Sequence, residues 1–391
     1  MDRGQVELAV RFVLSNNRPG SVTRITTDTA NVFVKRGIPT TVVVPRVDWL
    51  DFKLFQLSRS RFRDRIRYGA RLLLEVLSSS VGRRQWRGLT GYGADPRIRV
   101  VWYWLTPPPS SGNGREVTVV QPVYVVPNLL RSMTDYRTKI ITVVHNNYLR
   151  EMQSPVPEQA AWKAHCVAID QKLAVYRVAV SEQTKQAAEQ LGIQVHRVVN
   201  WGVDTARFHP PERRTRRQSL KVLLSCALNP QKGQRIGVEA LKQLKTAYGT
   251  KIRCESIGYV LPECVAFFDH NHGYLHGDAY VKAIQDSDIF VYPSLFDGFP
   301  APPLEAMACG CAVVTTAVEG VTEYAVDGEN CLVCHPGDPI ALRERIARLI
   351  RGESLRQRLQ TNASHSAQAY SIERAAERLF AFLKEVQQLP S

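Results

Sequence analysis

Two carboxylates and one lysine lie in segments whose residue types suit an anionic ligand. Asp297 and Glu305 are eight positions apart in LFDGFPAPPLEAMACG, with no charged residue between them. Lys232 ends the segment CALNPQK before a predicted helix, where a compact positive charge beside helix amides favours phosphate. The two acids would accept hydrogen bonds from hydroxyl groups on either side of a phosphate-sized place. A sugar joined through diphosphate to a nucleoside has this order of hydroxyls and anions.

The local sequence around the acids predicts a loop that runs into a helix. The segment follows the predicted strand IFVYPS, so it would lie at that strand's carboxyl end. Pro302 and Pro303 suit a first helical turn, and we expect Glu305 in the same turn, where it complements the positive helix end. Gly298 is expected to bend the backbone so that free amides point at a ligand. The alternative is that Glu305 only caps its helix.

Strand-length runs rich in valine and isoleucine alternate with helix-length stretches along nearly the whole chain. The polar, proline-containing segment FHPPERRTRRQ separates two such arrays. The predicted strands begin at Val6, Thr40, Ile98, Glu116, Lys139 and Tyr176 before this linker, and at Lys221, Lys251, Ile289, Cys311 and Asn330 after it. The pattern predicts an α/β protein of two doubly wound domains facing across a cleft. The domains span 1–208 and 216–369, and a last helix at about 370–391 packs back on the first.

The segment DGFPAPPLEAMACG resembles the E-x7-E hallmark of the family-4 (group 1) retaining glycosyltransferases of the GT-B fold. The resemblance covers the second domain well and the first more weakly. It implies two Rossmann-like domains, with Asp297 contacting the donor sugar and Glu305 holding the ribose hydroxyls. Asp297 departs from the pattern, because the family has glutamate there and aspartate is one methylene shorter.

The same resemblance extends to neighbouring residues of the donor site. Residues expected to bind the donor beside the two acids are Gly298, Phe299, Pro300 and Ala301. The segment VTTAVEGVTEYAVDGENCLV is similar to the family's G-G-x-x-E run, which assigns a donor contact to Glu323. Glu319 replaces the first glycine of that run.

The family's diphosphate clamp, G-R-L-x-P-x-K-G, corresponds to CALNPQKG in this chain. Lys232 aligns with the clamp lysine and is assigned a catalytic and donor-binding role. Ala227 stands where the family has arginine, and losing such a contact costs about 3 kcal/mol of transition-state stabilisation if nothing replaces it. Arg235, or an arginine from the first domain, is a candidate replacement. The alternative is greater reliance on Lys232 and the helix start.

Two residues of the first domain are candidates for the acceptor side. His145 closes the predicted strand KIITVVHN, and similar enzymes place a histidine there, where it would orient a hydroxyl or take its proton. The alternative for His145 is a local hydrogen bond at the strand end. The loop NNRPGS corresponds to the family's glycine-rich first loop and retains Gly20.

The resemblance implies a metal-independent, retaining hexosyl- or deoxyhexosyltransferase that needs no cofactor. Such an enzyme moves a sugar from a nucleotide-sugar donor to a glycan, lipid-linked or other hydroxyl acceptor, in cell-surface polysaccharide or glycoconjugate synthesis. Two alternatives remain open. One is a catalytically degraded GT-B protein that acts as a basic binding scaffold, and the other is a GT-B sugar-nucleotide epimerase or glycan phosphorylase.

The formal net charge is +15, and positive residues concentrate between Arg59 and Arg87. Such a segment favours an anionic membrane surface or a diphosphate lipid carrier, and a solvated face is the alternative. No nucleic-acid partner is expected. The N-terminus does not resemble a signal peptide, and no run is apolar enough to cross a bilayer. We therefore expect a cytoplasmic protein, peripheral at the inner membrane face.

Several patterns suggest other chemistry and are set aside. CLVCH matches a haem-attachment pattern but lies in a predicted buried strand, and HNHGYLH has metal-like spacing without suitable partners. The acids of DSD at Asp286 to Asp288 are expected to end a helix rather than bind a metal. The chain contains neither a P-loop nor G-x-G-x-x-G, which argues against a nucleotide hydrolase or a dinucleotide oxidoreductase. The eight cysteines are expected to be reduced and buried.

Overall fold

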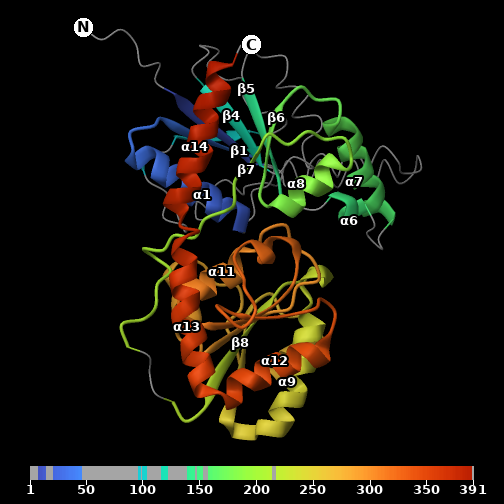
Figure 1. The fold of residues 1–391 in the computed structure, drawn as a ribbon, viewed down its shortest axis with the longest axis vertical. Coiled ribbons are helices and arrows are strands. Elements are labelled where there is room, and N and C mark those ends of the chain that lie inside the picture. Colours follow the sequence, from blue (N-terminus) through green and yellow to red (C-terminus); the bar gives the residue numbers. More distant parts are fainter. Residues whose placement is uncertain are drawn as a thin grey trace. The chain divides into compact units, whose positions relative to one another are not determined.

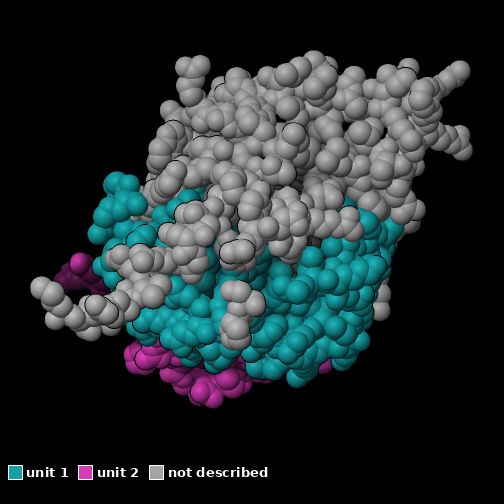
Figure 2. All heavy atoms as spheres, turned by 90° about the horizontal axis from the view of Figure 1, so that it is seen from above, with its two compact units in different colours: residues 1–200, 375–391 teal, residues 201–374 magenta. Residues whose placement is uncertain are grey.

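The computed structural model divides the chain into two compact units (Figures 1 and 2). Unit 1 comprises residues 1–200 and 375–391, and unit 2 comprises 201–374. The structure describes residues 8–14, 21–45, 96–97, 99–103, 116–121, 139–145, 148–152, 157–213 and 217–389. Gly20 and the basic segment from Arg59 to Arg87 lie outside the described residues. None of the helices within these ranges is both long and apolar enough to cross a membrane.

The described strands of unit 1 form one parallel sheet in the order β3-β2-β1-β4-β5-β6-β7. These strands are β1 (Ala9–Leu14), β2 (Thr40–Pro45), β3 (Arg99–Tyr103), β4 (Glu116–Gln121), β5 (Lys139–Val144), β6 (Tyr176–Ala179) and β7 (Arg197–Val198). After its first residue β5 is buried throughout, as expected for a parallel strand covered on both faces. The described helices of this unit that precede its last helix are α1 (Ser21–Lys35), α6 (Tyr148–Met152), α7 (Pro157–Asp170) and α8 (Glu182–Glu189).

The last helix, α14 (Ile372–Gln388), packs on the sheet of unit 1 beside α1 (Figure 1). The rings of Phe33 and Phe380 are 5.7 Å apart between centroids. Arg36 pairs with Glu377 at 2.5 Å, and Lys139 at the start of β5 donates to the carbonyl of Val386 at 2.9 Å. A ring contact and two polar contacts thus join α14 to α1 and to the start of β5.

The described strands of unit 2 form a second parallel sheet in the order β10-β9-β8-β11-β12-β13. Its strands are β8 (Leu220–Cys226), β9 (Ile252–Gly258), β10 (His270–Asn271), β11 (Ile289–Tyr292), β12 (Ala312–Thr316) and β13 (Leu332–Cys334). Its helices are α9 (Gln234–Tyr248), α10 (Gly277–Gln285), α11 (Ala301–Ala308), α12 (Pro339–Arg351) and α13 (Glu353–Gln368). α9 packs against α12, and α11 packs against α13, so helices cover the sheet (Figure 1). Both sheets show the predicted α/β class.

The boundary between the units lies at residue 200, whereas the sequence suggested 208. The reason is a local pairing of two distant segments within unit 2. Val203 donates to the carbonyl of Tyr370 at 2.9 Å, and Ile372 donates to the carbonyl of Val203 at 2.8 Å. A Cβ on Gly202 would lie 2.5 Å from the Ile372 Cα, so this close approach requires glycine.

All eight cysteines are free and buried. Burial raises the pKa of the Cys226, Cys254 and Cys331 thiols to about 12, and that of Cys334 to about 11. Because only the thiolate is a good nucleophile or metal ligand, these side chains behave as small apolar groups. The two cysteines of the haem-like CLVCH pattern therefore lie at β13, in the hydrophobic core.

We predict that the folded chain resists thiol alkylation. All eight thiols are shielded by burial, and the raised pKa values of Cys226, Cys254, Cys331 and Cys334 keep these four protonated at pH 8, so iodoacetamide should add almost no mass to the native protein. The same reagent should add eight groups after denaturation. Intact-mass spectrometry measures both, and rapid labelling of Cys331 or Cys334 in the native protein would contradict a closed β13 edge.

Candidate functional site

Asp297 and Lys232 form an ion pair in unit 2. Asp297 lies in the loop after β11, and Lys232 ends the short 3-10 turn after β8. Asp297 Oδ2 also accepts a hydrogen bond from the Tyr292 hydroxyl at 2.6 Å. The side chain of Asp297 is 14% exposed and that of Lys232 is 30% exposed, so the pair is partly shielded but reachable from solvent. Sequence reasoning selected both charged residues and missed Tyr292, which has the appearance of an ordinary strand residue.

Backbone contacts hold the two loops together. The carbonyl of Gln231 accepts from the Leu295 amide at 2.7 Å and from the Ser294 hydroxyl at 3.2 Å. Gly233 follows Lys232 with φ of +67°, and a Cβ there would lie 1.9 Å from the Pro293 carbonyl oxygen. Only glycine allows both this conformation and this approach. The loops after β8 and β11 are thus fixed at one edge of the sheet, with the start of α9 beside Lys232.

A third loop reaches Asp297 from the end of β12. The Gly320 amide donates to the Asp297 carbonyl at 3.1 Å, and the Asp297 amide lies 3.4 Å from the Glu319 carboxylate. Glu319 is 5% exposed. A Cβ on Gly320 would lie 2.1 Å from the Gly298 carbonyl oxygen. Sequence reasoning treated Glu319 only as a departure from a family pattern, yet its carboxylate lies against the backbone of Asp297.

Glu305 does not lie in the first turn of α11, where the sequence predicted it. α11 begins at Ala301, so Glu305 is its fifth residue and lies beyond the first turn. The expectation that it complements the positive helix end was wrong, because that interaction fades after the first turn. Instead Glu305 is 2% exposed and accepts a hydrogen bond from the Tyr280 hydroxyl of α10 at 2.9 Å. Tyr280 was also missed, because its contact with Glu305 joins two different helices.

The start of α11 offers fewer amides than a typical helix start. Pro300 is the N-cap, and Pro302 and Pro303 have no N–H to donate. Gly298 lies in a backbone bend, as expected, although it is not among the described glycines with positive φ. The close approaches that require glycine in this region are those of Gly233 and Gly320. The anion-binding capacity of this region therefore depends mainly on Lys232 and the uncapped start of α9.

Other residues of the predicted donor site surround this centre. Phe299 is buried, with its ring centroid 5.4 Å from that of Tyr324, whose hydroxyl donates to the Pro300 carbonyl at 2.9 Å. Burial, with charge from Asp297 nearby, raises the pKa of Tyr324, so its hydroxyl stays protonated. Glu323 is half-buried in the turn after β12, and its carbonyl accepts from the Tyr370 hydroxyl.

Arg235, one candidate replacement for the missing arginine, has a partner elsewhere on the surface. Ala227 directly follows β8, beside the turn that carries Lys232. The Arg235 guanidinium pairs with Glu263, and its side chain is 73% exposed. This ion pair gives Arg235 a carboxylate partner on the surface of unit 2.

His145 belongs to unit 1 and follows the last residue of β5. It is 7% exposed, so its imidazole is mostly enclosed by protein at the carboxyl end of that parallel strand. This is the edge at which ligands bind in open α/β sheets.

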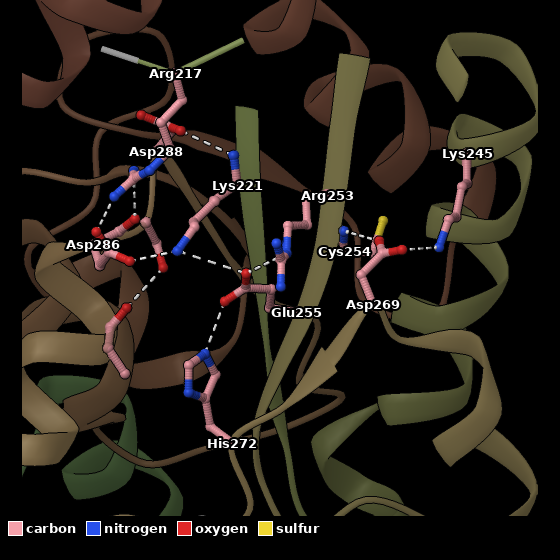
Figure 3. A network of polar contacts seen from close by, with 12 residues as sticks. Arg217, Lys221, Lys245, Arg253, Cys254, Glu255, Asp269, His272, Asp286 and Asp288 are labelled. Carbon is pink, nitrogen blue, oxygen red and sulfur yellow. Dashed lines mark hydrogen bonds and ion pairs between the residues drawn. The ribbon is translucent and has the colours of Figure 1, made fainter. Parts of the chain in front are cut away.

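The remaining polar patterns of unit 2 form a separate network near the amino ends of β8 and β11 (Figure 3). Asp286 pairs with Arg217 and Lys221, and the Lys221 amide donates to Asp288 at 2.9 Å. Partial burial opposes ionisation of Asp286, but hydrogen bonds and charge from the two cations outweigh it and lower its pKa. Asp286 thus has two cationic partners, and Asp288 accepts a hydrogen bond from a backbone amide. Within the described residues, no three His, Cys, Asp or Glu side chains gather in a way that would hold a metal ion.

Glu255 is the buried centre of this network. Its side chain is 4% exposed and lies 2.9 Å from Arg253, 3.7 Å from Lys221 and 2.8 Å from the His272 ring nitrogen (Figure 3). The HNHGYLH pattern therefore supplies one histidine to a structural carboxylate.

Comparisons with known proteins show what unit 2 is similar to. Residues 207–366 match the family of glycosyl transferases group 1, which confirms the resemblance seen in the sequence. A Campylobacter jejuni N,N'-diacetylbacillosaminyl-diphospho-undecaprenol alpha-1,3-N-acetylgalactosaminyltransferase is 35% identical over 121 residues, 30% of this chain and 32% of that protein. A lipopolysaccharide core biosynthesis mannosyltransferase from Rhizobium leguminosarum is 30% identical over 209 residues, 47% of this chain and 58% of that protein. The chain thus matches less than two thirds of the length of either relative.

The fold has solved neighbours over nearly the whole chain. The structure of Anabaena HepE in complex with UDP and glucose superposes with a TM-score of 0.70, at 16% identity, over 96% of this chain and 99% of that one. The likeness confirms the predicted GT-B fold of two Rossmann-like domains.

We predict that Gly320→Ala destabilises the chain by about 2–3 kcal/mol, because its Cβ would strike the backbone of the Gly298 loop. Gly352→Ala is the matched control, since φ there is −103° and the nearest atom, a carbonyl oxygen, is 3.0 Å from the added carbon. The control should cost about 0.5 kcal/mol. Urea unfolding measures both free energies, and equal costs would contradict the close contact.

We predict that Glu255→Gln lowers the free energy of unfolding by about 2 kcal/mol, because the buried carboxylate loses its charge-assisted contacts with Arg253 and His272. The exposed Glu239→Gln is the control and should change this free energy by less than about 0.5 kcal/mol.

The contribution of this network to stability is also pH-dependent. Since its pKa is lowered, Asp286 stabilises the fold above its unfolded value near 4, and this contribution disappears as the pH falls through the folded value. Urea titrations between pH 3 and pH 7 test this pH dependence. An unchanged urea midpoint in Glu255→Gln would refute the predicted loss of stability in that variant.

Proposed function

We propose that this chain, whose residues 207–366 belong to the group 1 family of glycosyl transferases, transfers a sugar from a nucleotide-sugar donor to a hydroxyl acceptor. We further propose that the reaction retains the anomeric configuration, uses no metal, and moves a hexosyl or deoxyhexosyl group. The observation that carries the proposal is the contact of Lys232 with Asp297 at the loop edge of the second sheet.

The charges of this edge match the parts of a nucleotide sugar. Lys232 and the start of α9 would bind the diphosphate, which is the group that leaves with negative charge. Asp297 would accept hydrogen bonds from the sugar, and Glu305 from the ribose. Gly298 to Ala301 and Glu323 would line the same donor site. Lys232 therefore acts on the atoms where charge develops, while the two carboxylates fix the ligand on either side of them.

The proposed reaction exchanges one bond at the sugar for another. The bond between the anomeric carbon and the diphosphate oxygen breaks, and the acceptor oxygen bonds to the same carbon on the same face. The acceptor hydroxyl loses its proton to the departing diphosphate, whose charge Lys232 stabilises. His145 and Gly20 are proposed to contact the acceptor, with His145 orienting its hydroxyl.

The acceptor is proposed to be a glycan or a lipid-linked sugar, made for a cell-surface polysaccharide or glycoconjugate. The names of relatives support this, since they include enzymes for a diphospho-undecaprenol acceptor and for lipopolysaccharide core. We propose a cytoplasmic enzyme peripheral to the membrane, consistent with the basic segment between Arg59 and Arg87. A sugar-nucleotide epimerase would act without an acceptor, and a basic scaffold would not depend on Lys232 or Asp297.

We predict that a nucleoside diphosphate stabilises the protein against heating. A panel of UDP, GDP, ADP and their common sugar conjugates should contain a ligand that adds about 2.7 kcal/mol at a hundred times its dissociation constant. Lys232→Ala should weaken that ligand at least 10-fold, because the diphosphate loses its cation. Differential scanning fluorimetry and calorimetry measure these effects.

Lys245→Ala is the matched control. Lys245 pairs with Asp269 at 2.7 Å and is 35% exposed, but it lies in the last turn of α9, away from Lys232. It should leave the affinity unchanged. A panel without any stabilising ligand, or equal losses in the two variants, would overturn the proposed function.

A further inference from the structure

Two tyrosine hydroxyls each donate to one of the two site carboxylates. Tyr292 ends β11 and donates to Asp297 Oδ2 at 2.6 Å. Tyr280 lies in α10 and donates to Glu305 Oε2 at 2.9 Å. Hydrogen bonds to a carboxylate are charge-assisted and fix its orientation more firmly than neutral ones. Neither tyrosine follows from the motif that contains the acids.

Tyr292 is built to remain a donor. Its side chain is 3% exposed, and burial together with the charge of Asp297 raises its pKa well above 10. The hydroxyl therefore keeps its proton at any working pH and directs it at the carboxylate. Asp297 Oδ2 is also the partner of Lys232, whose side chain is more exposed and flexible. When a diphosphate competes for Lys232, Tyr292 still holds Asp297, because its ring is fixed in the core at the end of a strand.

Tyr280 serves the other acid in a comparable way. Its ring meets that of Phe208 edge to face, with centroids 6.1 Å apart, and Phe208 is 2% exposed. Glu305 is itself 2% exposed, so its carboxylate has limited access to solvent and its orientation depends on protein donors such as Tyr280.

We propose that Tyr292 and Tyr280 are positioning residues with separate tasks. Tyr292 orients Asp297 toward the sugar of the donor, and Tyr280 orients Glu305 toward its ribose. The inference rests on the proposed function, because it assigns the two carboxylates to the two ends of a nucleotide sugar. Its specific content is a division of labour, in which each hydroxyl controls one part of the ligand and leaves the other part unaffected.

The test compares two ligands across two variants that each lose only a hydroxyl. Calorimetry measures the affinity of the full chain for UDP and UDP-glucose, or for GDP and GDP-mannose if the guanine ligands bind. Tyr280→Phe should weaken the nucleoside diphosphate and its sugar conjugate alike, by about 10-fold. Tyr292→Phe should weaken the sugar conjugate by about 10-fold and leave the nucleoside diphosphate within about twofold. Each variant thus serves as the control for the other.

The possible outcomes separate this inference from the proposed function. If the unaltered chain binds none of these ligands, both proposals fail. If it binds them but both variants lose stability without this crossed pattern of affinities, the tyrosines are structural only and the inference alone is wrong. Equal weakening of both ligands by Tyr292→Phe would also contradict it, since the hydroxyl of Tyr292 would then not act through the sugar alone.

Discussion

The ion pair between Lys232 and Asp297 is the interaction on which the organisation of this site depends. It brings a cation suited to phosphate within reach of a carboxylate suited to sugar hydroxyls, at one edge of a parallel sheet. Because the pair is only partly shielded from solvent, it remains open to competition from an anionic ligand. Under the proposed function, a diphosphate that binds Lys232 would draw it from Asp297, so ligand binding would change this contact.

The fold produces this contact through strand order and two glycines. β8, β11 and β12 are neighbours in the sheet, so the loops at their carboxyl ends meet. Gly233 and Gly320 then let those loops approach more closely than any side chain would allow. In the same sheet, Glu255 of β9 and Asp286, which precedes β11, pair with cations in a second network. One sheet thus holds the same kinds of charged residue in two separate clusters.

The α/β class and the positions of most strands along the chain could be predicted from the sequence, and so could the choice of Lys232 and Asp297 as candidate site residues. Alternating strand and helix patterns are local, and the motif around the acids is contiguous. The strands β7 and β10, of two residues each, are too short to produce such a pattern. The placement of Glu305 in a first turn was wrong because α11 begins one residue before its prolines. Glu319 and Tyr280 were missed because their contacts join segments that are more than twenty residues apart in the chain. Tyr292 lies only five residues before Asp297 and was missed because it has the appearance of an ordinary strand residue.

The most direct test of the account is a double-mutant cycle on Lys232 and Asp297, with the affinity for UDP or GDP measured by calorimetry. Asp297→Asn alone should strengthen binding of the nucleoside diphosphate, because Lys232 loses a competing partner and the phosphates lose a repelling charge. In a Lys232→Ala background the same substitution should have a clearly smaller effect. An equal effect of Asp297→Asn in both backgrounds, or weaker binding from it alone, would show that the ion pair does not govern this site.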